Sequence, residues 1–250
     1  KQQAPDTRLT IKPSLDHVYE KHDEIRGVKG NFDKVMTVFH ELKRLKKEYP
    51  RLSAELGTVI SRWNIQDIDE ISRFALSLDP DSYRNEIAEE RSEMFNYDDQ
   101  ITPDHQAYQQ AIETFSSHQL QMMNRKPLFH RVTNAFRLVY YQLALEILHQ
   151  KTQPIPCYAG ITNAHLTPYG DVWACCTLGY TRSMGNLKEA GYDFRSVWHS
   201  PKADQVRKQI KNKECVCPLA NQMYSNILLD MKSMIKVMSY IKGIDKAGRS

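Results

Sequence analysis

The cysteines of this chain are confined to its C-terminal third. All five lie between Cys157 and Cys217, and the first 156 of the 250 residues contain none. Five clustered thiols are too few for the disulfide framework of a secreted domain, whereas clustered thiols in a reducing compartment more often serve a metal. We therefore predict that the chain carries a small domain folded around a metal centre.

A tight hairpin separates the first two cysteines. Cys157 is followed by twelve residues, then Gly170, four more residues and Cys175. Strand signals flank the turn over 164–167 and 172–174, and glycine tolerates the positive φ that a tight reversal requires. We expect the second strand to return Cys175 toward Cys157.

A Cys-x-Cys pair, Cys215 and Cys217, raises the number of converging thiols to four. Four thiolates are the usual ligand set of a 4Fe-4S cluster or of a structural zinc ion, and the residues alone leave both open. The alternative is that the cysteines are small buried hydrophobic side chains, as isolated free cysteines often are. The fifth, Cys176, can be an ordinary buried thiol in either case.

The N-terminal part alternates short β-type runs with amphipathic helical stretches. Strands are predicted at 8–12, 56–60 and about 82–87, and helices at 32–49 and 65–78. This order implies parallel strands joined by crossover helices. Because three such strands leave an exposed edge, we expect a further part of the sheet upstream of Lys1.

The rest of the chain is predicted to be mainly helical apart from the hairpin. Two amphipathic stretches fill 104–150, separated near Lys126-Pro127, and further helices are expected over 194–211 and 231–241. Pro, Gly and Cys become frequent from Pro154 onward, which indicates a second, smaller domain.

Short motifs follow one another through the C-terminal region. G-D-V-W-A-C stands at 170–175, M-G-N-L at 184–187, V-W-H-S at 197–200, C-V-C at 215–217 and N-I-L at 226–228. Together with the spacing of the first two cysteines, this order resembles the SPASM and twitch auxiliary-cluster domains of radical S-adenosylmethionine (SAM) enzymes. The resemblance implies one auxiliary 4Fe-4S cluster, held by Cys157, Cys175, Cys215 and Cys217.

The chain departs from the family pattern in two places. Asn221 stands where many relatives carry a further Cys, so a complete two-cluster SPASM domain is excluded. The Cys-x3-Cys-x2-Cys loop that defines radical SAM enzymes is absent from the 250 residues. The resemblance places that loop upstream of Lys1, so the chain is expected to be a fragment that is inactive alone, with a second 4Fe-4S cluster only in the full-length protein.

A second run of matching residues lies in the N-terminal part. S-L-D at 14–16, H-D-E-I-R-G at 22–27 and G-N-F at 30–32 are similar to the “S-L-D-G … H-D-x-x-R-G … G-S-F” run of the same superfamily. T-V-I-S at 58–61, with Asn64, looks like the end of its next strand. In relatives, the matching Ser and Arg help to bind SAM.

SAM presents a carboxylate, an ammonium group and ribose hydroxyls, which polar residues at strand ends and an Arg suit. Arg84 and Glu86 are added because barrel active sites gather at the carboxyl ends of strands. The implied SAM-binding set is Ser14, Asp16, Arg26, Ser61, Asn64, Arg84 and Glu86. Without the resemblance, Ser14 and Asp16 would be turn caps and Arg26 a surface salt-bridge residue.

The predicted fold class is α/β: the C-terminal part of a partial (β/α)6 TIM-type barrel, followed by a small α+β cysteine-rich SPASM/twitch-like domain. The barrel part is expected over 1–118 and a helical linker over 119–153. The iron–sulfur domain is expected over 154–230, and a C-terminal helix and tail over 231–250.

The resemblance implies a maturase-like radical SAM oxidoreductase. The complete enzyme would cleave SAM to a 5′-deoxyadenosyl radical that attacks a small-molecule or peptide substrate, with an electron-donor protein as partner. The alternative is a non-enzymatic module in which four cysteines hold zinc or an iron–sulfur cluster for structure or electron transfer.

Charge and hydropathy exclude two classes of partner. The 34 basic and 30 acidic residues, with a net charge of +4, are spread along the chain, so nucleic acid is not an expected partner. No apolar run approaches the roughly 20 residues of a bilayer span, so no membrane is expected either. Without a visible signal peptide, the expected location is the cytoplasm.

Two further groups of polar residues need an interpretation. An acidic run is predicted to be a solvated face, with a proton acceptor as the alternative; it comprises Asp79, Asp81, Glu86, Glu89, Glu90 and Glu93. His17 and His22 are predicted to be polar loop residues and not metal ligands.

Overall fold

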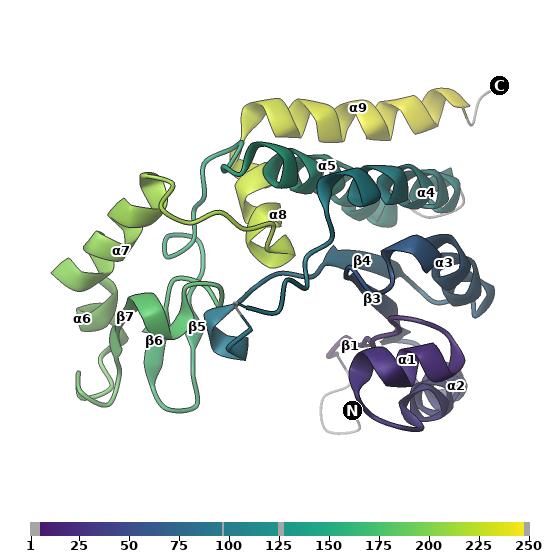
Figure 1. The fold of residues 1–250 in the computed structure, drawn as a ribbon, viewed down its shortest axis with the longest axis horizontal. Helices are drawn as coiled ribbons and strands as arrows, with labels where there is room; N and C mark the ends of the chain where they lie inside the picture. Colours follow the sequence, from purple (N-terminus) through teal and green to yellow (C-terminus); the bar gives the residue numbers. More distant parts are fainter. Residues whose placement is uncertain (1–5, 97, 125–127, 248–250) are drawn as a thin grey trace. The chain divides into compact units, whose positions relative to one another are not determined.

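The computed structural model describes residues 6–96, 98–124 and 128–247. The chain divides into two compact units, Lys1–Ala88 and Glu89–Ser250 (Figure 1). Helices and strands occur in both, which confirms a mixed α/β protein, whereas a TIM-type barrel and the four-part domain division remain predictions. None of the described helices is long and apolar enough to cross a membrane.

Parallel strands and their connecting helices make up the N-terminal unit. Leu9–Ile11 (β1) pairs with Leu52–Ala54 (β2), and Leu56–Ile60 (β3) pairs with Tyr83–Ile87 (β4), in parallel. A parallel bridge from Ser14 to Gly57 links the chain after β1 to β3. The helices are α1 (Tyr19–Arg26), α2 (Asn31–Glu48) and α3 (Ile68–Ser77), the last preceded by the 3-10 turn Ile65–Asp67.

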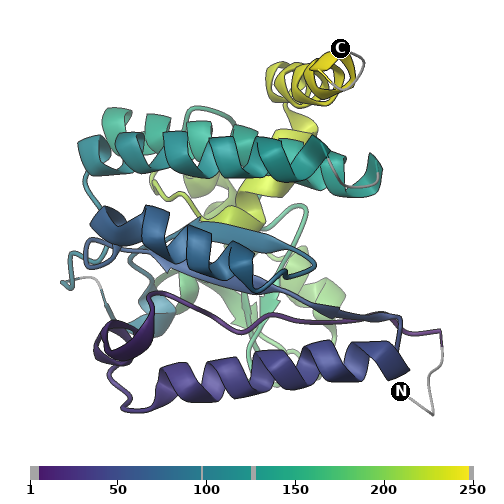
Figure 2. The same cartoon turned by 90° about the vertical axis from the view of Figure 1, so that its right-hand side faces the viewer.

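One face of these strands packs against helices α2 and α3 (Figure 2). Leu56 and Tyr83 from the strands join Phe39 and Leu42 of α2 and Ala75 of α3, and each is at most 5% exposed. Burial of such side chains contributes on the order of 2 kcal/mol each. This shared core holds β3 and β4 in place against α2 and α3.

The sequence predicted β1, β3, β4, α2 and α3 and missed two elements. Helix α1 has one fully buried side chain, His22, so it lacks the apolar stripe by which a helix is recognised. Strand β2 has only three residues and abuts β3. His22 lies in α1, so the prediction that it is a loop residue is wrong, whereas His17 lies in the bend before α1 as predicted; both side chains are at most 1% exposed.

The C-terminal unit combines long helices with a small antiparallel sheet. Helices α4 (His105–Asn124) and α5 (Leu128–Gln150) lie side by side, and α9 (Met231–Ala247) packs on α5 (Figure 1). The sheet order is β5 (His165–Leu166), β6 (Asp171–Trp173) and β7 (Ser183–Asn186). The remaining helices are α6 (Phe194–Trp198), α7 (Pro201–Lys211) and α8 (Ala220–Leu229), with 3-10 turns at Ser92–Met94 and Gly179–Arg182.

The helix predicted over 194–211 is interrupted between Trp198 and Pro201. Pro201 suits the first turn of α7 because it has no N–H to leave unpaired, and the Ser200 hydroxyl caps that turn by accepting from Ala203 N at 3.1 Å. The hairpin and the helical pair over 104–150 are confirmed, while Lys126-Pro127 lies outside the described residues.

Candidate functional site

The hairpin that precedes Cys175 is fixed by its own polar residues. Gly170 adopts φ +95° in the turn, and Thr167 Oγ1 accepts a hydrogen bond from Asp171 N at 3.0 Å. Asn186 Nδ2 donates to Asp171 Oδ1 at 2.9 Å and ties the turn to β7. The G-D and G-N residues of the sequence motifs therefore shape the strand that delivers Cys175.

The loop of Cys157 is attached to α8 and to the hairpin. Tyr158 N donates to Asn226 Oδ1 at 2.9 Å, so the Asn of the N-I-L motif orients the residue after Cys157. Gly160 has φ +73°, and a Cβ there would lie 3.0 Å from the Cβ of Ala174. A glycine is required because the loop and the strand before Cys175 touch at this point.

Arg207 of α7 also holds this loop. Its Nε donates to Gly160 O at 2.7 Å, its Nη2 donates to Trp198 O at 2.6 Å, and its guanidinium lies 4.6 Å from the Trp198 ring centroid. Trp198 and Ser200, the W and S of the V-W-H-S motif, thus have structural roles, one under Arg207 and one as the cap of α7.

Cys215 and Cys217 lie in an irregular segment between α7 and α8. Gln153 Nε2 donates to the carbonyl oxygen of Cys217 at 2.8 Å, which anchors the segment to the chain that follows α5. The Thr177 hydroxyl lies against the Cys217 thiol, and this hydrogen bond opposes the rise in the pKa of Cys217 that burial causes.

The structure brings the four predicted ligands to one apolar core. Cys175 is buried in this core, and Cys157, Cys215 and Cys217 pack against it. Burial raises the pKa of Cys175 to about 12, and the charges of Cys215 and Cys157 act in the same direction. Burial likewise raises the pKa of Cys215 to about 11 and that of Cys217 well above its ordinary value. Charge on one thiol therefore disfavours ionisation of a neighbour: Cys157 acts on Cys175 and Cys215, and Cys175 acts on Cys217.

These thiols fit a centre that supplies positive charge. Buried thiols that repel one another when ionised stay protonated on their own, whereas metal ligands must be thiolates. Tetrahedral zinc holds thiolates about 3.8 Å apart, from a Zn–S bond of about 2.3 Å. Among the described cysteines, no three sulfur atoms lie within 4.8 Å of one another, so a single zinc ion would require them to draw closer.

Cys176 has a different environment from its neighbour Cys175. It is buried, which raises its pKa to about 11, and the Arg91 guanidinium beside it opposes that rise. Arg91 pairs with Glu89 at 2.7 Å and with Glu93 at 3.2 Å. Glu89 is only 7% exposed, so the prediction of a solvated face is wrong for this member of the acidic run.

Asp16 is the centre of a polar network at the carboxyl end of β3. Its Oδ1 accepts from Val59 N at 2.8 Å, and its Oδ2 pairs with Arg26 Nε at 2.6 Å. Asn64 Nδ2 donates to Asp16 O at 2.8 Å and to Val59 O at 2.9 Å, and Asn64 Oδ1 accepts from Ser61 N at 2.8 Å. The structure therefore brings together four of the residues predicted to bind SAM.

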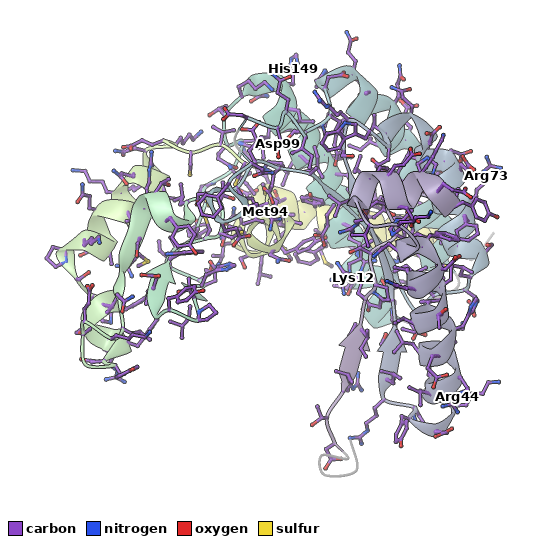
Figure 3. All side chains as sticks on the ribbon, turned by 60° about the horizontal axis from the view of Figure 1, so that its bottom comes forward. Lys12, Arg44, Arg73, Met94, Asp99 and His149 are labelled. Atoms are coloured by element: carbon purple, nitrogen blue, oxygen red, sulfur yellow. The ribbon has the colours of Figure 1, made fainter. Side chains whose placement is uncertain are left out.

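The other three predicted SAM-binding residues lie outside this network. Arg84 Nη2 donates to Glu55 Oε2 at 2.5 Å, and Glu86 Oε1 pairs with Lys12 Nζ at 3.3 Å; Lys12 is labelled in Figure 3. By strand alternation, Arg84 and Glu86 face away from the side of β4 that carries Tyr83. Ser14 is half-buried and contributes the backbone bridge to β3.

Sequence reasoning missed a group formed by His17, Asp67 and Glu70, whose ligand-type atoms lie within 4.8 Å of one another. Asp67 is far from His17 in sequence, so no local spacing marks the group. His17 Nδ1 accepts from Val18 N at 2.8 Å, so Nε2 carries the proton that it donates to Asp67 Oδ2 at 3.0 Å. Since Nε2 has no lone pair to offer, and Lys21 also pairs with Asp67 at 3.2 Å, the group is a salt-bridge cluster.

Comparison with known proteins gives two findings. Residues 157–218 match the SPASM family, described as an iron–sulfur cluster-binding domain. The fold is similar to that of anSMEcpe, an anaerobic sulfatase-maturating radical SAM enzyme, solved with bound AdoMet and the Kp18Cys peptide: TM-score 0.52, 12% identity, covering 99% of this chain and 71% of that one. Histidine-tagged anSMEcpe with bound AdoMet gives a TM-score of 0.51 at 12% identity over the same shares of the two chains.

No curated protein sequence matches the chain. The two findings agree, because the matched region contains all four converging cysteines and the solved neighbour is a radical SAM enzyme. Residues 157–218 are thus similar to the SPASM iron–sulfur cluster-binding domain, and the chain as a whole has a fold similar to that of a radical SAM enzyme.

Proposed function

We propose that this chain is the auxiliary-cluster portion of a radical SAM enzyme, with a 4Fe-4S cluster held by Cys157, Cys175, Cys215 and Cys217. The observation that carries the proposal is the convergence of these four thiols on one core inside the region that matches an iron–sulfur domain. Such a cluster supplies one-electron chemistry or a site for substrate. The protein's part is to hold the thiolates and exclude water.

SAM would be bound in the N-terminal unit. Arg26 is partly exposed and is held by Asp16, so its free donors suit the carboxylate of SAM. Asn64 is fully buried and its amide is used by Asp16, Val59 and Ser61, which makes it a positioning residue. Ser14 and Ser61 would offer hydroxyls, and Arg84 and Glu86 would line the opposite face of the strands.

A peptide is the proposed substrate, with an electron-donor protein as the second partner. The solved neighbour binds a peptide together with AdoMet, which supports that choice at the level of fold. The complete enzyme would be a maturase-like oxidoreductase of the cytoplasm, with the partial barrel and domain boundaries as predicted above. The alternative is a zinc module without enzyme activity, for which the same four thiols would have to move together.

Anaerobic reconstitution of the chain with iron and sulfide tests the proposal. We expect a brown protein with broad visible absorption and about four irons per chain. Cys217→Ser should lose most of this iron, whereas the matched control Cys176→Ser should retain it. A colourless protein with one tightly bound zinc, or equal iron loss in both variants, would contradict the proposal.

A further inference from the structure

A cavity of about 270 Å³ opens beside Cys217 within the C-terminal unit. Its lining combines polar groups with aliphatic side chains from the end of α5 and from the segment around Cys217. The polar lining residues are Glu89, Glu90, Thr102 and Lys151, and the apolar ones are Ile147, Leu148, Val216 and Pro218. Cys217 also lines the cavity, and it alone of the lining residues is a ligand in the proposed cluster site.

Glu89 brings a buried negative charge to this cavity. Its side chain is 4% exposed, and Arg91 Nη2 holds Oε1 at 2.7 Å. Arg91 also binds Glu93 and does not line the cavity, so the guanidinium fixes the carboxylate from behind. Glu89 and Cys217 line the same cavity, which places the carboxylate near the thiol.

Two more features make the cavity attractive to a cation. Glu90 adds a second carboxylate, and the C-terminal end of α5, where Ile147 and Leu148 lie, is the negative end of a helix dipole. Lys151 is the single basic residue of this lining, and it is exposed. The described wall therefore carries more negative than positive charge.

We infer that this cavity binds a primary ammonium group on an aliphatic stem, such as a lysine side chain of a peptide substrate, beside the auxiliary cluster. An ammonium group has three donors, which matches the two carboxylates and the Thr102 hydroxyl. The aliphatic wall accommodates the methylene stem, which lysine buries while its charged end finds a polar partner. The inference rests on the proposed function and adds the class of side chain that the enzyme recognises.

Binding of n-pentylamine to the cluster-loaded chain, with n-pentanol as the uncharged comparison, tests the inference. We expect the amine to raise the unfolding midpoint and to alter the electron paramagnetic resonance spectrum of the reduced cluster, because it would lie next to a ligand of that cluster. The alcohol should do neither. Glu90→Gln should weaken amine binding at least fivefold.

Glu93→Gln is the matched control, because Glu93 also contacts Arg91 but lies outside the cavity lining. It should leave amine binding within twofold of the parent chain. Equal binding of amine and alcohol, no loss in Glu90→Gln, or equal losses in both variants would overturn the inference. Iron content, measured first, separates the two claims: a chain with iron that ignores the amine refutes the cavity alone, and a chain without iron that binds it refutes the cluster alone.

Discussion

In the N-terminal unit the buried amide of Asn64 finds all its hydrogen-bond partners within the fold, whereas in the C-terminal unit the buried thiols repel one another when ionised. Asn64 uses its amide on Asp16, Val59 and Ser61, so that network is complete without any ligand. Cys175, Cys215 and Cys217 instead share an apolar core in which burial raises the pKa of each thiol. A complete network stabilises a fold by itself, and an incomplete one indicates where something must bind.

Metal removal should have the largest effect, and it should destabilise the C-terminal unit much more than the N-terminal unit. Structural metal sites contribute roughly 10 kcal/mol or more to folding, so chelation of the loaded chain should expose backbone amides over 157–218. Residues 6–88 should keep their protection because their polar network contains no metal ligand in the proposal. Hydrogen exchange with and without chelator measures this, and equal loss of protection in both units would break the comparison.

Asn64→Ala should damage the complete network. It removes a fully buried amide and leaves buried groups of Asp16 and Val59 without their donor, at a cost of about 2–3 kcal/mol in the free energy of unfolding. Iron content should be unchanged, since the residue lies in the other compact unit. Denaturant unfolding and iron analysis of the same preparation check both parts; a stable variant that has lost iron would reverse the assignment.

Arg182→Gln should change the cluster without removing it. Arg182 lies near enough to Cys215 that its charge favours the thiolate, and it pairs only loosely, at 3.5 Å, with Glu214. Loss of a positive charge disfavours the added electron, so the reduction potential should fall by on the order of 50 mV, about tenfold in the one-electron equilibrium. Spectroelectrochemical titration measures the shift. Glu214→Gln should move the potential the other way, and shifts of the same sign in both variants would refute the electrostatic explanation.

Asp23→Asn should have the smallest effect, a loss of stability at neutral pH that disappears in acid. The backbone amide of Phe32 donates to Asp23 Oδ1 at 2.8 Å and holds the pKa of this carboxyl below its ordinary value of 3.8. A lowered pKa in the folded state stabilises the fold at higher pH, and this stabilisation is lost as the pH falls through the folded pKa, below 3.8. Unfolding midpoints of Asp23→Asn should therefore depend less steeply on pH in that range than those of the parent chain; identical slopes would show that the contact does not matter.

The sequence predicted the elements that carry a clear period and the ligands that carry a clear spacing. β4 shows buried alternation, β3 is a short and almost fully buried run, and the first two cysteines are separated by a recognisable hairpin. Helix α1 was not predicted because it is polar. The interruption before Pro201 was not predicted either, although Ser-Pro is a helix-start signal. Both errors concern local polar chemistry, which the spacing of apolar residues does not reveal.

Contacts between distant residues could not be predicted in the same way. Glu89 pairs with Arg91 and lies near Cys217, and His17 pairs with Asp67, yet nothing in the intervening sequence indicates either meeting. Strand β7 and helices α6 and α7 lie between Cys175 and Cys215 in the sequence. The ligand set was therefore predicted from the resemblance to known domains and not from local spacing. Only the folded chain shows which acidic residue is buried beside a thiol.

Arg207 connects α7 directly to the loop that carries Cys157. One guanidinium joins the helix to Gly160 O and to Trp198 O. A displacement of α7 would therefore be transmitted to that loop directly and not through the sheet. A lysine at this position could donate to only one of the two carbonyls at a time, so the helix would hold the loop less firmly. The position of the Cys157 loop therefore depends on the planar guanidinium of Arg207 as well as on the hydrogen bond from Tyr158 N to Asn226 Oδ1.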